Sequence, residues 1–576
     1  MNAVNRIMLA AMVAELLTAT TALWAQSQNR QVGTPYTVTA DPLVPRPPQP
    51  PCVVPLFSNY TFAHFADTIQ SFTFAPPAGC AGPWEKIVFE IDFSENPGVQ
   101  FDRTASVYIN NANLYFGTTP EPLASLTNTW HVERDITDYA ALLESSQPGT
   151  IVLQNCTSDC PPPYDTFLNG VFTVSANLEF YPARWRRGLP AAADLVLPLV
   201  QSNGQGGVNL PDFLYTPSDQ LTTTFSLPTN VEQAYLDVVA QSQFDDEQWY
   251  ACFPNNLSSI NEVYGCGNTD FRETEVTIDG QPAGIAPVSP WVFTGFLPDE
   301  WVPIPGAQTL DFVPYRVNLT PFAGLLSNGQ PHTIALSVFD DDDYFSVSAS
   351  LLLYLDAAST KVSGAVTRNT LTPPSPAVFD NLAGTTTVTG TITAKSQRQY
   401  TIAGYVQTSH GTVSTAVSAQ QNFSGTQTID FDTVDFSVLD QNTSVETSLS
   451  SLTTVSSDQG ITVIEENYRF PITVDLIYPV TSSPFGLTVA TTQKYESTKL
   501  IWRDRRLEDF RLVTNSVSAT DAGSKSSSQQ YTSFGFDTPF YSCEIASADN
   551  ELTLVSPTCG PRQGGDPTGR WNLPLP

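Results

Sequence analysis

Short segments in which apolar and polar residues alternate fill residues 61–182, and turn residues separate them. KIVFEIDF, TASVYIN and GVFTVSANLEFY are typical of these segments, and glycine, proline and asparagine lie between them. Successive side chains of a strand point to opposite faces, so alternation of period two indicates strands with one buried face. Short strands at regular spacing predict an antiparallel sandwich. TDYAALLESS is the single helical signal of this stretch.

The same style continues through residues 186–356 and contains an internal repeat. RVNLTPFAGLLSNGQPHTIALSV echoes HVERDITDYAALLESSQPGTIVLQN, since both read strand, Thr-x-Phe/Tyr, Leu-Leu, turn, strand. From residue 357 onward threonine, serine and valine dominate, which favours strands again. We therefore predict an all-β protein: two tandem jelly-roll antiparallel sandwiches packed side by side, at 28–185 and 186–356, and a C-terminal β-rich domain at 357–576. That last domain is interpreted as structural, with glycan or cell-wall binding as the alternative.

The N-terminus, residues 1–27, has the pattern of a secretory signal peptide. Arg6 supplies a positive start, residues 7–23 are mostly apolar, and small residues near position 25 offer a cleavage site. An uncleaved anchor is the alternative, but Glu15 interrupts the apolar run and makes it a poor membrane span. We expect a secreted, extracellular protein with no membrane association after signal removal.

The charge balance is strongly acidic. The chain has 57 Asp and Glu against 25 Lys and Arg, a net charge of −32. Such a surface repels phosphate-rich partners, which excludes nucleic acid and anionic lipid as expected partners.

Eight cysteines fall in near pairs, which is usual in secreted proteins and favours local disulfides. No histidine has metal-ligand spacing with another histidine or with a cysteine pair, which argues against zinc. Six Asn-x-Ser/Thr sequons predict surface glycosylation. The pairs are Cys52 with Cys80, Cys156 with Cys160, Cys252 with Cys266 and Cys543 with Cys559, and the sequons begin at Asn59, Asn155, Asn256, Asn318, Asn422 and Asn442.

One stretch, GVQFDRTASVYINNANLYFGTTPEP, places an acid and a base side by side before a strand. Val99 and Phe101 point one way in an extended segment, so Asp102 points the other way. Glu121 follows in a loop stiffened by prolines. A surface ion pair between Asp102 and Arg103 is the simpler interpretation from spacing alone, and a polar site on the rim of the sandwich is the other.

The motifs of this stretch, in order, resemble those of the peptide N-glycanase A family, and more distantly those of bacterial peptide N-glycosidase F. FDRTASVYIN, TTPEP and DITDYAALL carry the resemblance in the first half, and DDEQWY, FRETEVTIDG, TGFLPDEWVPIP and LTPFAGLLSNG carry it in the second. The resemblance implies a glycoamidase that hydrolyses the bond between N-acetylglucosamine and asparagine in N-linked glycopeptides or glycoproteins. It implies no metal and no cofactor, and release of the intact glycan as a glycosylamine while asparagine becomes aspartate.

The resemblance also implies a set of site residues. Asp102 is the principal catalytic group, and Arg103 keeps it ionised or orients the substrate. The second carboxylate is Glu247 or Glu273, and Glu121 is a third candidate. The expected sugar-binding residues are Trp249, Tyr250 and Trp301, with Asp299 and Glu300 as acceptors for sugar hydroxyls.

Two other functions remain open at this stage. A glycosidase with two carboxylates would cut inside the glycan and leave the first sugar on asparagine. A non-catalytic glycan-binding or cell-wall protein could share the scaffold. Gly-x-Ser-x-Gly, His-Glu-x-x-His and glycine-rich phosphate loops do not occur in the sequence.

Overall fold

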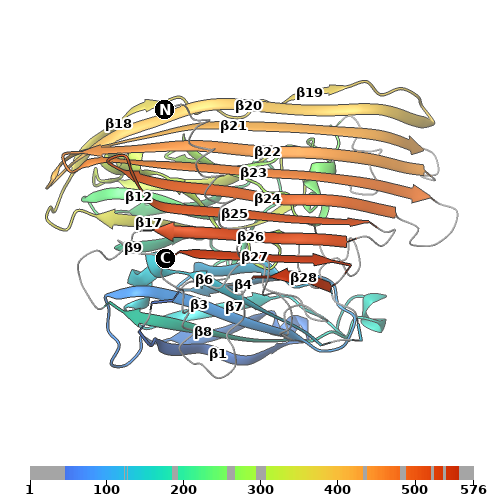
Figure 1. The fold of residues 1–576 in the computed structure, drawn as a ribbon, viewed down its shortest axis with the longest axis horizontal. Helices are drawn as coiled ribbons and strands as arrows, with labels where there is room; N and C mark the ends of the chain where they lie inside the picture. Colours follow the sequence, from blue (N-terminus) through green and yellow to red (C-terminus); the bar gives the residue numbers. More distant parts are fainter. Residues whose placement is uncertain are drawn as a thin grey trace.

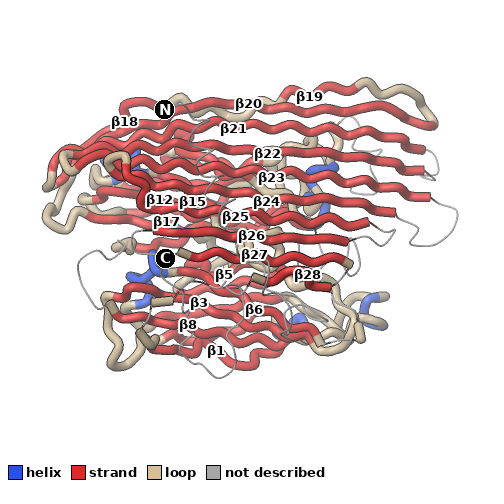
Figure 2. Tube along the Cα trace, in the orientation of Figure 1, coloured by secondary structure: helices blue, strands red, loops and turns tan. Residues whose placement is uncertain are grey.

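The computed structural model describes residues 44–556, except 45, 48, 122–123, 126, 184–191, 206, 256–265, 293–306, 433–437, 480–487, 521–524, 536–539 and 550. The predicted signal peptide, residues 1–27, lies outside the described residues. Strands make up most of the described chain and pair antiparallel in five sheets, so the all-β prediction is confirmed (Figures 1 and 2). In the described part, no helix is both long enough and apolar enough to span a bilayer.

The first eight strands form a sandwich of two four-stranded sheets, β1-β8-β3-β6 and β2-β7-β4-β5. The strands are β1 (Cys52–Phe62), β2 (Ile69–Phe74), β3 (Trp84–Glu95), β4 (Thr104–Ile109), β5 (Ala112–Thr118), β6 (Asn128–Asp135), β7 (Gln147–Leu153) and β8 (Phe172–Pro182). Short 3-10 helices lie at Phe65–Asp67 (η1), Thr137–Leu143 (η2) and Tyr164–Thr166 (η3). The helical signal TDYAALLESS thus corresponds to η2.

The second sandwich repeats this topology strand for strand, in sheets β10-β17-β12-β15 and β11-β16-β13-β14, with β9 added beside β17. Its strands are β9 (Leu195–Leu199), β10 (Asp212–Leu214), β11 (Leu221–Ser226), β12 (Val231–Gln243), β13 (Glu273–Ile278), β14 (Gln281–Pro287), β15 (Tyr315–Asn318), β16 (Pro331–Phe339) and β17 (Tyr344–Leu355). Its helices are η4 (Phe244–Asp246), η5 (Trp249–Ala251), η8 (Thr320–Phe322) and α2 (Ala323–Leu326). The repeat seen in the sequence maps onto β6-η2-β7 and β15-η8-α2-β16, which confirms the duplication.

The remaining residues form one eleven-stranded sheet whose long strands run side by side across Figure 1. The strands are β18 (Ser363–Asn369), β19 (Ala377–Asp380), β20 (Thr387–Thr408), β21 (Gly411–Asp432), β22 (Val438–Ser457), β23 (Gly460–Pro479), β24 (Thr488–Arg503), β25 (Arg506–Thr520), β26 (Lys525–Gly535), β27 (Tyr541–Ala548) and β28 (Glu551–Val555). Buried and exposed positions alternate along β21, so one face of the sheet is covered and the other is solvated. Asp504 and Arg505, both with positive φ, form a two-residue hairpin turn.

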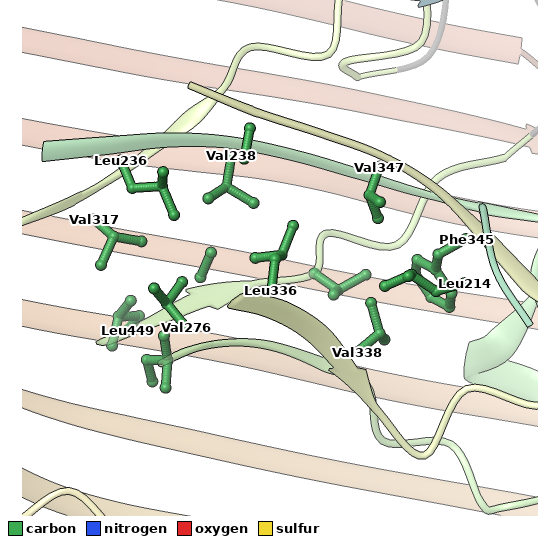
Figure 3. Close-up of a cluster of buried hydrophobic side chains, with 14 of the residues drawn as sticks. Leu214, Leu236, Val238, Val276, Val317, Leu336, Val338, Phe345, Val347 and Leu449 are labelled. Carbon is green, nitrogen blue, oxygen red and sulfur yellow. The ribbon is translucent and has the colours of Figure 1, made fainter. Parts of the chain in front are cut away.

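The C-terminal sheet and the second sandwich share one hydrophobic core. Leu236, Val276 and Leu336 of the sandwich and Leu449 of β22 belong to the same buried cluster (Figure 3). The first sandwich has its own core, to which the second sandwich contributes Leu352. The C-terminal sheet is therefore part of the main core and not a loosely attached addition.

Three predicted cysteine pairs form disulfides: Cys52–Cys80, Cys156–Cys160 and Cys252–Cys266. Cys543 is buried in β27, and Cys559 lies outside the described residues.

The sequons differ in their accessibility. Asn59 and Asn442 are exposed, Asn318 and Asn422 are half-buried, and Asn256 lies outside the described residues. Asn155 does not fit the prediction of surface glycosylation, because its side chain is fully buried. Its Nδ2 donates to the carbonyl oxygens of Phe62 (2.8 Å) and Gly170 (3.1 Å). In the folded protein this nitrogen is therefore not accessible for attachment of a glycan.

Candidate active site

The loop between β3 and β4, residues 96–103, carries Asp102 and Arg103. Gln100 anchors this loop from inside, since its Nε2 donates to the carbonyl oxygen of Cys156 at 3.0 Å. The Oε1 of the same side chain accepts a hydrogen bond from the Arg103 guanidinium at 2.8 Å. Asp102 and Arg103 themselves are half-buried. A buried amide thus fixes the backbone that presents the acid and the base.

Glu121 lies against Asp102, although 19 residues separate the two in the chain. The backbone N–H of Asp102 donates to Glu121 Oε1 at 2.9 Å, and the two carboxyl groups also hydrogen-bond each other. The backbone N–H of Thr119 donates to the carbonyl oxygen of Arg103 at 2.8 Å, which ties the two loops together. A hydrogen bond between two carboxyl groups needs a proton, so this pair favours a singly protonated state.

Glu247 reaches the same cluster from the second sandwich. It follows η4 at the end of β12, in the loop that corresponds to the β3–β4 loop of the first sandwich. The charges of Asp102 and Glu121 act on Glu247 and, together with burial, raise its pKa well above the usual range. Its Oε1 is buried without a hydrogen-bond partner among the described residues. The duplicated fold therefore brings one catalytic candidate from each sandwich to one place.

Buried groups behind Glu247 hold it in position. Asp246 forms an ion pair with Arg272 at 2.8 Å, and both side chains are fully buried. The backbone N–H groups of Asp342 and Asp343 also donate to Asp246 Oδ2, at 2.6 and 2.9 Å. The acidic run that includes these two residues therefore anchors η4.

Polar contacts join the two sandwiches beside the cluster. Thr104, next to Arg103, donates its hydroxyl to Gln241 Oε1 at 3.2 Å and accepts from Gln243 Nε2 at 3.1 Å. Both glutamines lie on β12, so the acid cluster is located at the junction of the sandwiches.

The environment raises the pKa of every carboxyl group in the cluster. For Asp102 burial raises the pKa to about 6, and the hydrogen bond with Glu121 and the charge of Arg103 limit the rise. For Glu121 burial and the charge of Asp102 raise the pKa to about 8. Paired carboxyl groups with shifted pKa values are common in sites of acid–base catalysis.

Glu95, the last residue of β3, is a fourth carboxyl group that the sequence analysis missed. It is 1% exposed, and neither of its oxygens has a hydrogen-bond partner among the described residues. Burial and the charge of Glu121 raise its pKa to about 8. The alternation of β3 already predicted a strand ending here, but no local signal distinguished a buried strand-end glutamate from a solvated one.

Two groups of exposed aromatic rings flank the cluster. Phe101, Tyr164 and Phe167 are 37–43% exposed and meet with ring centroids 5.7–6.4 Å apart. On the other sandwich Tyr344 meets Phe213 and Tyr215 at 5.5 and 5.6 Å.

These rings lie near the acids on both sides. Phe101 precedes Asp102 directly in the chain. Burial raises the pKa of Tyr344 to about 12, and the charge of Glu247 adds a small part of the shift. Aromatic side chains that cluster on the surface beside buried acids are a candidate binding surface.

Several predicted site residues lie elsewhere. Glu273, at the start of β13, is fully buried and forms an ion pair with Arg398 of β20, so it sits between the second sandwich and the C-terminal sheet. Trp249 and Tyr250 are 0% and 1% exposed, because the C-terminal sheet covers them, and the Trp249 ring lies 6.5 Å from that of Phe423. They offer no ring face to a sugar in this structure.

Asp299, Glu300 and Trp301 lie outside the described residues. Of the sequence candidates, the structure brings together Asp102, Arg103, Glu121 and Glu247.

Comparison with known proteins agrees with the motif resemblance. Residues 42–372, more than half of the chain, match the family model described as peptide N-acetyl-β-D-glucosaminyl asparaginase amidase A. A curated relative from Prunus dulcis, peptide-N4-(N-acetyl-β-glucosaminyl)asparagine amidase A, is 29% identical over 382 residues. The alignment covers 63% of this chain and 61% of the relative, so the chain spans about three fifths of that protein's length.

Among solved structures, PNGase F, described as a glycosylasparaginase from Flavobacterium meningosepticum, is similar at 14% identity and a TM-score of 0.34. The match covers 53% of this chain and 96% of that one. PNGF-II is similar at 15% identity and a TM-score of 0.37, covering 53% of this chain and 66% of that one.

Proposed function

The chain belongs to the peptide N-acetyl-β-D-glucosaminyl asparaginase amidase A family, and from that premise we propose that it is a glycoamidase. It hydrolyses the amide between N-acetylglucosamine and the asparagine side chain of N-linked glycopeptides or glycoproteins. The products are a peptide aspartate and the intact glycan as a glycosylamine. The observation that carries the proposal is that Glu247 lies within electrostatic range of Asp102 and Glu121, where hydrogen bonds of Thr104 with β12 join the two sandwiches.

The cluster supplies the groups that amide hydrolysis needs. The pKa of Asp102 is about 6, so at neutral pH this residue is a carboxylate that takes a proton from the attacking water. The oxygen of that water bonds to the amide carbon, and the Arg103 guanidinium stabilises the negative charge that develops on the carbonyl oxygen. Glu247, whose pKa is raised well above its usual range, stays protonated and gives its proton to the departing nitrogen.

Glu121 in its protonated form positions Asp102. It accepts from the Asp102 backbone N–H and bonds the Asp102 carboxyl group, which fixes the direction of the base. The aromatic groups on either side of the acids suit the two ends of a glycopeptide, because the apolar ring faces of sugars pack on aromatic side chains. Secretion belongs to the proposal, and the disulfides Cys52–Cys80, Cys156–Cys160 and Cys252–Cys266 support it.

Mass spectrometry of a defined glycopeptide tests the reaction. A glycoamidase leaves an unglycosylated peptide in which asparagine has become aspartate, whereas a glycosidase leaves one N-acetylglucosamine on an unchanged asparagine. Asp102→Asn is expected to lower kcat by about 10²–10⁴-fold while circular dichroism stays unchanged. An unmodified asparagine that still carries a sugar, or full activity of the variant, contradicts the proposal.

A further inference from the structure

A cavity of about 750 Å³ lies between the two sandwiches and the C-terminal sheet. Its lining comes from all three parts of the chain, and Asp102, Glu121 and Glu247 do not belong to it. Sites for small ligands measure about 300–1,000 Å³, so the space suits a bound molecule. The site is thus separate from the acid cluster.

Four aromatic side chains form a continuous row in this lining. Tyr315 of β15 meets Tyr468 of β23 at 5.2 Å between ring centroids, Tyr468 meets Phe470 at 6.2 Å, and Phe470 meets Tyr495 of β24 at 4.9 Å. The three tyrosines are only half-buried, so they keep accessible surface in the wall of the cavity. A row of this kind offers several ring faces to an elongated ligand.

The charged groups of the lining are six cations and eight carboxylates, which leaves a formal excess of two negative charges. Each lysine and arginine that lines the cavity has a carboxylate partner within 4 Å, and each lining carboxylate has a cationic partner. The ion pairs are Lys86–Asp135, Arg134–Asp311, Arg316–Asp237, Arg316–Asp138, Lys499–Glu466, Arg503–Glu508, Arg511–Asp509 and Arg46–Glu133. Among the described residues, every cation of the lining is paired with a carboxylate, so none remains unpaired for a phosphate or an acidic sugar, and this favours a neutral ligand rich in hydroxyl groups.

The backbone argues against a peptide in this cavity. The lining strands β23, β24 and β25 are interior strands, and each is hydrogen-bonded to a neighbour on both sides. An extended peptide binds by adding to an exposed sheet edge, and this wall is the face of a sheet.

We propose that this cavity is a second, non-catalytic binding site for a neutral oligosaccharide. The sugar rings pack along Tyr315, Tyr468 and Tyr495, and their hydroxyls bond the paired carboxylates and guanidinium groups. Binding at this site does not depend on amide hydrolysis, so its test is independent of the proposed reaction.

Calorimetric titration of the Asp102→Asn chain with a neutral, peptide-free biantennary N-glycan tests the site. Tyr495→Leu in that background is expected to weaken binding about tenfold, as the loss of a stacked ring contact predicts. Phe379→Leu is the matched control, because Phe379 is a 66% exposed ring of the same sheet outside the cavity. The disialylated form of the glycan is expected to bind no more tightly than the neutral form.

Absence of binding to the unaltered cavity, equal affinity of the Tyr495→Leu and Phe379→Leu chains, or tighter binding of the acidic glycan overturns the proposal. A crystal of the unaltered chain soaked with the neutral glycan gives a second readout that needs no substitution. Glycan density along Tyr468 and Tyr495 supports the site, and density at the acid cluster alone contradicts it.

Discussion

The acids at the sandwich junction cannot all be ionised at neutral pH. Burial raises the pKa of Asp102, Glu121 and Glu247, and the charges of Asp102 and Glu121 raise that of Glu247 further. Like-charged carboxyl groups in one site share protons, and the group with the lowest pKa ionises first. The surroundings of each residue therefore separate a base, Asp102, from two acids that keep their protons.

This separation predicts a bell-shaped pH dependence of kcat/KM. Activity rises as Asp102 ionises at about pH 6 and falls as Glu121 loses its proton at about pH 8. Glu121→Gln imitates the protonated side chain at every pH, so the alkaline limb moves upward while the acid limb remains. Glu121→Ala serves as the control that loses the hydrogen bond to Asp102, and an alkaline limb unchanged in the glutamine variant contradicts the assignment.

Glu95 predicts a pH dependence of stability. Its pKa in the folded chain is about 8, whereas an unfolded glutamate has a pKa of about 4.3. Between these values the folded state holds a proton that the unfolded state has released, so stability falls as pH rises, by about 1.4 kcal/mol per pH unit. Glu95→Gln removes this dependence and is expected to raise the melting temperature at pH 7.5 much more than at pH 4. Equal gains at both values contradict a buried, protonated Glu95.

The repeated topology of the two sandwiches explains why two acids come from equivalent loops. Asp102 lies in the β3–β4 loop and Glu247 in the equivalent β12–β13 loop, so packing the two copies side by side brings equivalent loops to one junction. The loops reach their geometry by different means: Gln100 anchors the first, and the buried pair of Asp246 and Arg272 anchors the second.

Removal of one member of that pair is expected to be more harmful than removal of both. Arg272→Met leaves the Asp246 carboxylate buried without its cation, which costs about 3–5 kcal/mol. Adding Asp246→Asn removes the stranded charge and restores part of the stability, although Glu247 stays less well positioned. Urea denaturation of both single variants and the double variant forms a cycle that measures the coupling, and additive losses contradict it.

Across the whole molecule, local patterns predicted the strands and the duplication but not the long-range neighbours. Alternation of period two can be read within a single strand, and it predicted strands in both sandwiches. From residue 357 onward, the content of threonine, serine and valine predicted a β-rich domain without placing its strands. Glu273 and Arg398 are 125 residues apart in the chain. No local pattern could therefore predict that this glutamate pairs with an arginine of the C-terminal sheet.

The sugar-binding prediction for Trp249 and Tyr250 shows the same limit. A Trp-Tyr pair after an acidic run looks identical in sequence whether it faces solvent or another sheet. In the structure the C-terminal sheet covers this pair. The side-chain amide nitrogens of Gln427 and Gln441 in that sheet donate to the carbonyl oxygens of Cys252 and Ala251. Asp102 and Arg103 were selected by a motif and not by a periodicity, and their catalytic roles stay predictions.

The shared core predicts that the second sandwich and the C-terminal sheet unfold together. Phe423 of β21 is 3% exposed and packs on Phe271 at 4.9 Å and on Trp249 at 6.5 Å, all within one cluster. Phe423→Ala is expected to cost about 3–5 kcal/mol and to lower one joint calorimetric transition. Phe379→Ala, at an exposed position of the same sheet, is expected to change stability by less than about 0.5 kcal/mol. If Phe423→Ala splits the transition, so that the sheet melts while the sandwich keeps its midpoint, the two do not share a core. Because the segment after Glu247 lies beneath Phe423, a joint transition also requires that the proposed glycoamidase activity disappear at the temperature at which the sheet melts.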